Sequence, residues 1–343
     1  TIGNPAYLAA YLVFHVWLAL YLLRQFWNKW WLRIVYSLLF IFYLLIIYFT
    51  ATRGTIIALV AVFFLFTAAI IWLWPKIFSA VSGFRRKLAA IGLAVFILIP
   101  LALFVLRDKN FIVSNTVLQR LTTISFSDKT TQARFAIWGM SFKGALDRPI
   151  LGWGQENYYL IFQKYFDPKL YSSEPWFDRS HNIIFDWLVH AGFLGLLSYL
   201  AIIGSALWMI WRGLKVSSLP IWEGLILTSL FLTHFIQNIF VFDNLNTYLL
   251  FFGFLAYSDF WSSGQKNQIA IQERYTSSPK NGVGFIFVSV AVFILVLSGG
   301  YFLHIKPILE SKALIKALQM HQAKAPMDVL IGEFKRALSY KTF

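Results

Sequence analysis

Long apolar stretches alternate with short polar connections along most of the chain. A helix needs about 20 mostly apolar residues to cross a membrane, and eight stretches approach that length: Ala6–Leu23, Ile34–Phe49, Thr55–Trp74, Leu88–Leu106, Ile183–Trp211, Ile221–Val241, Leu245–Trp261 and Val283–Leu303. The pattern predicts an all-α integral membrane protein with about eight transmembrane helices. Composition agrees, because only 13% of the 343 residues are charged, against about 25% in a typical soluble domain.

Basic residues in the short connections predict the orientation of these helices. They occur in Arg24–Arg33, in Pro75–Lys87, at Arg212 and Lys215, and at Lys266, Arg274 and Lys280. Short loops rich in Lys and Arg face the cytoplasm. We therefore expect the turn Thr50–Gly54, the long connection 107–182 and both termini on the extracytoplasmic side. The net charge of +15 is explained by membrane anchoring or by attraction to phosphates, and the absence of nucleic-acid motifs argues against a nucleic-acid partner.

Arg53 lies between the second and third apolar stretches, in the run LLIIYFTATRGTIIALV. An arginine at the centre of a membrane helix costs about 2.5 to 3.5 kcal/mol or more. The two stretches are separated only by Thr50–Gly54, so we expect a tight hairpin at a membrane face, with Gly54 supplying a positive φ. Arg53 then either extends to lipid headgroups or binds an anion.

The connection 107–182 is long enough to carry its own structure. Phe135, Trp138, Phe142 and Ala145 recur at helical spacing, which predicts an amphipathic helix over 132–146 that lies on or dips into the membrane interface. A second helix is expected over 157–166.

Arg134 stands at the start of the first predicted loop helix, and His181 lies immediately before the fifth apolar stretch. Both are expected on the same side as Arg53, and the sequence shows no obvious carboxylate neighbour for either arginine. Arginine suits phosphate oxygens, and histidine can donate to an oxygen or exchange a proton with it. Taken singly, Arg134 is more simply a solvated charge and His181 a residue near a helix cap. Together, the three residues predict an anion site.

Further polar residues supplement this predicted site. Arg179 is close to His181 and is a candidate ligand for phosphate. Glu156, Asp178 and Asp243 are candidate bases for an acceptor hydroxyl, although a solvated loop acid is the simpler explanation of each.

Two polar groups fall within the predicted spans. Asp186 shares a helix face with His190, which indicates either a buried pair or a role in orienting His181. His234, Gln237 and Asn238 form a polar stripe that interhelical hydrogen bonds would explain.

The sequence offers no constellation for a metal and no glycine-rich loop for a nucleotide, and cysteine is absent. We expect neither a metal nor another cofactor.

Three segments together resemble the O-antigen ligase and polymerase family: TRGTIIALV, ARFAIWGMSFKGALDRPILGWGQENY and DRSHNIIFDWLVHAGFLGLL. The resemblance covers roughly 44–261. It implies a GT-C-like, metal-independent glycosyltransferase of the cytoplasmic (inner) membrane, active on the extracytoplasmic face. The implied donor is an undecaprenyl-diphosphate-linked glycan. The acceptor stays open among a lipid such as the lipid A-core of lipopolysaccharide, a growing polysaccharide and a protein hydroxyl.

Residue by residue, the resemblance assigns catalytic roles to Arg53, Arg134 and His181. Direct attack on the anomeric carbon would invert its configuration. The alternatives are a transporter or flippase of lipid-linked sugars and a non-catalytic membrane protein of envelope assembly. Members of the family usually have more spans, and the sequence begins with Thr, so we expect further spans to precede it.

The last forty residues have a different pattern. Apolar positions at helical spacing before and after Ala325-Pro326 predict a helical hairpin over 304–343. We expect residues 1–303 to form the transmembrane domain, and the hairpin to be the start of a tetratricopeptide-like extracytoplasmic domain or a plain amphipathic tail.

Overall fold

The computed structural model describes residues 4–74, 83–123, 125, 128–171, 176–216, 219–263 and 282–340. Within these ranges every regular element is a helix, which confirms the predicted all-α class. The chain forms two compact units, Thr1–Ile271 and Gln272–Phe343. This boundary groups the eighth apolar stretch with the tail. The predicted division into a transmembrane domain, 1–303, and a separate hairpin domain stays a prediction.

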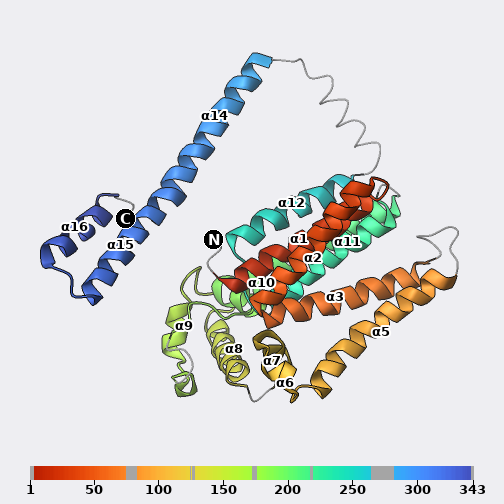
Figure 1. Ribbon diagram of the computed structural model, residues 1–343, viewed down its shortest axis with the longest axis horizontal. Coiled ribbons are helices and arrows are strands. Elements are labelled where there is room, and N and C mark those ends of the chain that lie inside the picture. Colours follow the sequence, from red (N-terminus) through yellow and green to blue (C-terminus); the bar gives the residue numbers. More distant parts are fainter. Residues whose placement is uncertain are drawn as a thin grey trace. The chain divides into compact units, whose positions relative to one another are not determined.

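The helices of the first unit are α1 (Pro5–Gln25), α2 (Trp30–Thr50), α3 (Arg53–Trp72), α5 (Gly83–Val105), α6 (Asn110–Val113), α7 (Thr116–Thr122), α8 (Lys129–Asp147), α9 (Tyr158–Lys164), α10 (Ile183–Lys215), α11 (Ile221–Asn238) and α12 (Leu245–Ser262), with a 3-10 turn η1 (Pro168–Leu170) (Figure 1). The second unit contains α14 (Gly282–Gly300), a π-helical turn η2 (Tyr301–Ile305), α15 (Lys306–Gln322) and α16 (Met327–Leu338).

Each of the eight predicted spans coincides with a helix. In the described part of the chain four of them, α1, α2, α3 and α10, are long and apolar enough to cross a membrane. The total of about eight spans stays a prediction.

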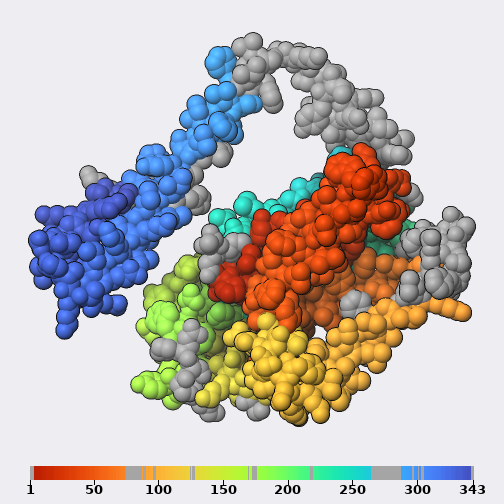
Figure 2. Space-filling model, in the orientation of Figure 1, coloured from red at the N-terminus to blue at the C-terminus, as the bar shows by residue number. Residues whose placement is uncertain are grey.

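The core of the first unit lies between α1, α3, α10, α11 and α12. Trp17 of α1 is fully buried, and its indole Nε1 donates a hydrogen bond to Thr233 Oγ1 of α11 at 2.9 Å. In contrast, α2 buries only Ile47 and exposes Phe42 and Phe49. This helix forms much of the face shown in orange-red in Figure 2, and its apolar surface suits contact with lipid.

The predicted hairpin between α2 and α3 is present, but its backbone differs from the expectation. Ala51, with φ of 52°, adopts the left-handed conformation, whereas Gly54 does not. Gly54 instead allows a close approach, because a Cβ added to it would lie 2.6 Å from the Cβ of Phe240. The first turn of α3 therefore packs directly on the chain that leaves α11.

The connection between α5 and α10 contains both predicted helices. Ile137 and Met140 of α8 pack on Tyr158 and Ile161 of α9. Phe135 and Phe142 of α8 remain exposed. This second apolar face is the one expected at the membrane interface, and that placement stays a prediction.

The turn before α9 is joined to α10 by backbone hydrogen bonds. Trp153 N–H donates to the carbonyl of Val189 at 2.8 Å, and Phe193 N–H donates to that of Pro149 at 2.7 Å. These bonds are possible because α10 breaks at Gly192, whose φ is 65° and whose added Cβ would lie 2.3 Å from the Ile150 carbonyl oxygen. The interruption fixes the loop against the start of α10.

In the second unit, α15 and α16 pack together through Ala313, Ala317, Leu330 and Ala337. Lys316 and Glu333 form an ion pair between the two helices. The helices occupy the segment predicted as a hairpin, and its relation to a repeat domain stays a prediction.

We expect Gly54→Ala to destabilise the protein by about 1–3 kcal/mol, because the added methyl group would overpack the contact with Phe240. Gly253→Ala on α12 is the matched control, since an added Cβ there meets nothing within 4 Å. The measurement is the thermal unfolding midpoint of each purified variant in detergent. Equal midpoints for both variants would contradict the tight contact.

Candidate functional site

A cavity of about 440 Å³ lies in the first unit, where the ends of several helices meet. Its wall comes from the start of α1, the turn between α2 and α3, α7, the start of α8, the residue before Asn182 and the end of α11. The lining residues are Asn4, Pro5, Ala6, Tyr7, Thr50, Ala51, Thr52, Arg53, Gly54, Thr55, Arg120, Thr130, Arg134, His181, Gln237, Phe240 and Val241. The structure thus brings Arg53, Arg134 and His181 to one cavity.

Arg53 is the first residue of α3, and its side chain is 28% exposed. Its Nη1 donates to Asp128 Oδ2 at 2.9 Å, and its Nη2 donates to Thr123 Oγ1 at 3.3 Å. The expectation that Arg53 has no carboxylate neighbour is therefore wrong. Asp128 lies 75 residues away in the sequence, so only the fold reveals the pair, which holds the guanidinium in one orientation.

Arg134 comes from α8 and is half-buried. Its Nη1 donates to the backbone carbonyl of Phe240 at 2.6 Å, just beyond α11. Burial, and next the charge of Arg53, lower the pKa of Arg134, although an arginine stays protonated at neutral pH. Among the described residues Arg134 forms no ion pair, so its charge is poorly compensated.

His181 sits on a left-handed backbone with φ of 52°. Asn182, which follows it, caps α10 by accepting a hydrogen bond from Ile184 N–H at 2.9 Å. The imidazole ring contacts the rings of Phe177 and Phe242, with centroids 5.8 Å and 5.4 Å away.

Burial, and next the charge of Arg134, lower the pKa of His181, although Asp178 and Asp186 act in the opposite direction. The lowered pKa favours the neutral form of the ring at pH 7. In that form one ring nitrogen donates a hydrogen bond and the other accepts a proton.

Arg120 is a lining residue that the sequence analysis did not single out. It lies exposed in the last turn of α7, and it has no ion pair within the described ranges. Asn115 caps α7 and accepts a hydrogen bond from the Tyr48 hydroxyl at 3.2 Å, which joins α7 to α2. The polar character of the segment 107–129 was visible in the sequence, but nothing there distinguished Arg120 from the other basic residues.

The backbone of α3 adds to the positive character of the cavity. Thr52, Arg53, Gly54 and Thr55 all line it. A helix N-terminus carries unpaired N–H groups and a partial positive charge that favour anions. The first turn of α3 has no acidic residue, and its N-cap makes no side-chain hydrogen bond. No aspartate or glutamate is found among the described residues that line the cavity, so three arginines and a helix N-terminus face it together.

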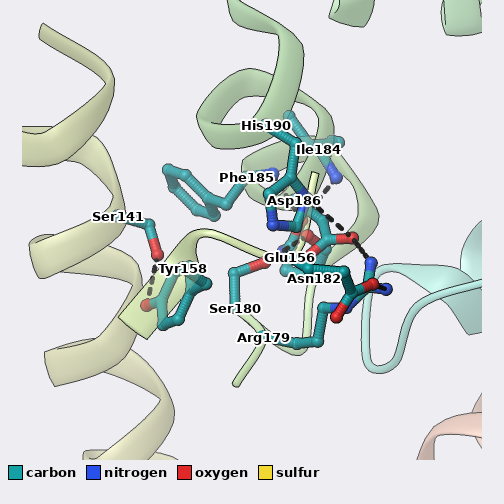
Figure 3. A network of polar contacts seen from close by, with 10 residues as sticks. All are labelled: Ser141, Glu156, Tyr158, Arg179, Ser180, Asn182, Ile184, Phe185, Asp186 and His190. Atoms are coloured by element: carbon teal, nitrogen blue, oxygen red, sulfur yellow. Dashed lines mark hydrogen bonds and ion pairs between the residues drawn. The ribbon is translucent and has the colours of Figure 1, made fainter. Parts of the chain in front are cut away.

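Three other candidate residues form a separate network outside the lining (Figure 3). Arg179 pairs with Glu156, and its Nη1 donates to Asp186 Oδ2 at 3.0 Å. Burial by itself would lower the pKa of Arg179, but Asp186 and Glu156 outweigh it and raise the pKa. The guanidinium is thus occupied by two carboxylates and stacks over the Phe242 ring.

Asp186 also lies 3.6 Å from His190 Nδ1. Of the two interpretations of Asp186, the structure contains the buried pair with His190. The charge of Asp186 raises the pKa of His181, and a second link runs through Phe242, which contacts both the His181 ring and Arg179.

Two residues of the polar stripe of α11, His234 and Asn238, have a partner other than the one expected. His234 Nε2 lies 3.1 Å from Asp243 Oδ1, and Asn238 Nδ2 donates to the same oxygen at 2.6 Å. The partner is therefore the turn after α11 rather than a neighbouring helix. This pairing occupies the candidate base Asp243, whereas the candidate Asp178 is exposed.

These features define a membrane protein with an arginine-lined cavity at its helix ends. A family model described as O-antigen ligase matches residues 38–200, a range that contains Arg53, Arg120, Arg134 and His181. The match covers slightly less than half of the chain and supports its resemblance to the O-antigen ligase and polymerase family. No match was found among curated proteins. In the part of the chain that is described, no group of three or more His, Cys, Asp or Glu residues could hold a metal.

We expect Asp186→Asn to destabilise the protein by about 2–4 kcal/mol, because removing one partner leaves the largely buried Arg179 without its buried counter-charge. Glu156→Gln is the matched control on the same arginine. Glu156 is 68% exposed, and an exposed pair contributes about 0–1 kcal/mol. Thermal unfolding in detergent measures both variants. A larger loss for Glu156→Gln would show that Asp186 is not the main partner.

Proposed function

We propose that the protein transfers a glycan from an undecaprenyl-diphosphate carrier to an acceptor hydroxyl on the extracytoplasmic side of the cytoplasmic membrane. The main support is the cavity itself, where Arg53, Arg120 and Arg134 converge with the N-terminus of α3 and no carboxylate is found among the described lining residues. Such a site suits a diphosphate. The family match supports action on lipid-linked glycans, and the basic short loops support the orientation.

In the proposed reaction the acceptor oxygen attacks the anomeric carbon of the first sugar. The bond from that carbon to the phosphate oxygen breaks, and its electron pair leaves with the diphosphate. The new glycosidic bond then has inverted configuration. Negative charge develops on the departing diphosphate, and cations fixed in advance stabilise it most where water is scarce.

The arginines would contribute unequally. Arg120 and Arg134 form no ion pair with any described residue, so their charges are available to the diphosphate. Arg53 is held by Asp128, which fixes its orientation and reduces its net charge. We therefore propose Arg134 as the main phosphate ligand, with Arg120 and Arg53 beside it. Arg179 already pairs with two carboxylates and would act through Phe242 on the position of His181.

His181 has two candidate roles: its N–H donates to a phosphate oxygen, or its free nitrogen accepts the proton of the acceptor hydroxyl. Two observations favour the second. Burial and Arg134 lower the pKa of His181, which favours the neutral ring that a base requires. The carboxylates weighed as alternative bases all lie outside the cavity lining: Glu156 pairs with Arg179, Asp243 pairs with His234, and Asp178 is exposed. Surfaces beyond this cavity would select the acceptor among a lipid, a polysaccharide and a protein.

Replacing Arg134, Arg53 or His181 by alanine should lower glycan transfer at least about 100-fold, because each removes a group proposed to act in the transition state. Arg120→Ala should lower it less, since that side chain is exposed. The assay is transfer by the purified protein from lipid-linked glycan to acceptor, with thermal unfolding as the check of folding.

Arg148→Ala is the matched control. Arg148 belongs to the same loop but stacks on Trp153 at 4.4 Å, outside the cavity lining. Unimpaired transfer by the alanine variants of Arg53, Arg134 and His181 would rule out the proposed enzyme. Binding of the donor by a wild-type protein that never transfers it would favour the non-catalytic alternative.

The pH dependence of kcat/KM should separate the two roles of His181, because kcat/KM reports the ionisation of the free enzyme. If neutral His181 is the base, kcat/KM is constant near pH 7 and falls only at pH values below 6.5, the ordinary pKa, since the folded pKa is lower. Asp178 raises the pKa of His181, so Asp178→Asn should move the fall to still lower pH. A kcat/KM that does not fall when His181 becomes protonated would indicate that His181 binds phosphate instead.

A further inference from the structure

Two buried polar side chains in the cavity wall have no hydrogen-bond partner. Gln237 is 1% exposed and Thr55 is fully buried. The amide Nε2 and Oε1 of Gln237 and the hydroxyl Oγ1 of Thr55 are all unpaired. A buried polar group left unpaired costs about 1–3 kcal/mol. Both residues line the cavity, so a molecule in the cavity can supply the missing partners.

The two side chains belong to the helix ends that meet at Gly54. Thr55 lies in the first turn of α3 and Gln237 in the last turn of α11, and these turns are in contact through Gly54 and Phe240. The rest of the α11 stripe is better satisfied, because His234 and Asn238 both contact Asp243. Gln237 differs from them in lining the cavity.

The chemistry of the unpaired atoms specifies the ligand. The Oε1 of Gln237 accepts only, its Nε2 donates only, and the Thr55 hydroxyl does both. An ionised diphosphate offers acceptors but no donor, so it cannot satisfy Oε1. A sugar hydroxyl donates and accepts, and a sugar ring presents several hydroxyl groups side by side.

We propose that Gln237 and Thr55 form a hydroxyl-binding subsite for the sugar that is attached directly to the donor diphosphate. This inference rests on the proposed function. The cavity volume of about 440 Å³ is at the small end of ligand pockets. Groups bound by the arginines and by Gln237 must therefore be neighbours, as the diphosphate and its first sugar are. The two side chains are then specificity residues, and the arginines bind the part common to all carriers.

The test measures donor affinity without any acceptor, which separates a donor sugar from an acceptor hydroxyl. The full chain is purified in detergent. It is titrated with the lipid-linked glycan extracted from the source cells and, separately, with undecaprenyl diphosphate alone. The variants are Gln237→Met and Thr55→Val, which keep approximate shape and remove hydrogen bonding. Ser229→Ala on α11 and Thr67→Val on α3 are matched controls, because neither residue lines the cavity.

Each subsite variant should bind the lipid-linked glycan about 3- to 10-fold more weakly, which corresponds to the net loss of one or two hydrogen bonds. Its affinity for undecaprenyl diphosphate should stay within about 2-fold of the wild type, and the controls should bind both as the wild type does. Arg134→Ala should weaken both ligands. This pattern would not arise from a general structural defect, because such a defect lowers both affinities.

Three outcomes would overturn the inference. Equal weakening toward both ligands would place Gln237 and Thr55 at the diphosphate, and unchanged affinity for both would mean that the subsite holds water only. A wild-type protein that binds neither ligand would remove the proposed function, and the subsite with it. If the wild-type protein binds both the lipid-linked glycan and undecaprenyl diphosphate, and only Arg134→Ala loses this binding, the proposed function is retained and the sugar subsite is rejected.

Discussion

The contact between Gly54 and Phe240 determines how the rest of the site is arranged. The side chain of Phe240 packs on the first turn of α3 at a place where only glycine fits. The backbone carbonyl of the same residue accepts a hydrogen bond from Arg134 of α8. One residue thus joins the turn after α2, the end of α11 and the long loop. Arg53, Arg134 and Gln237 belong to separate parts of the sequence, and the contacts of Phe240 hold their segments together around one cavity.

The distribution of carboxylates then divides the basic residues into three groups. Arg179 is bound by Asp186 and Glu156, and it stacks on Phe242, so it serves the structure around His181. Arg53 has one carboxylate partner, Asp128. Arg134 and Arg120 form no ion pair with any residue that the structure describes. Because uncompensated charge in a partly dry site interacts strongly with an anion, Arg134 and Arg120 define where a polyanionic ligand would bind.

The sequence predicted the helical spans, both loop helices and the three residues Arg53, Arg134 and His181 as one group, because apolar periodicity and residues beside span ends are local properties. It could not predict Asp128 as the partner of Arg53 or Arg120 as a lining residue, since both depend on how the loop folds back. Gly54 was assigned a positive φ, but Ala51 has it. A glycine in a turn can serve backbone conformation or close packing, and only the neighbour Phe240 distinguishes the two.

The unpaired atoms of Gln237 and Thr55 and the uncompensated arginines belong to residues that line the same cavity, and one ligand can explain both features. Each feature alone lowers the stability of the empty protein, since burial disfavours both an uncompensated cation and an unpaired amide. A fold selected for stability alone would place apolar side chains at these positions, as it does at Ile226 and Leu230 elsewhere on α11. The cost is offset when one ligand supplies negative charge to the arginines and hydroxyl groups to the neutral wall. A sugar diphosphate, the proposed donor group, carries both kinds of group close together, which would explain why the charged and the neutral parts of the cavity lie side by side.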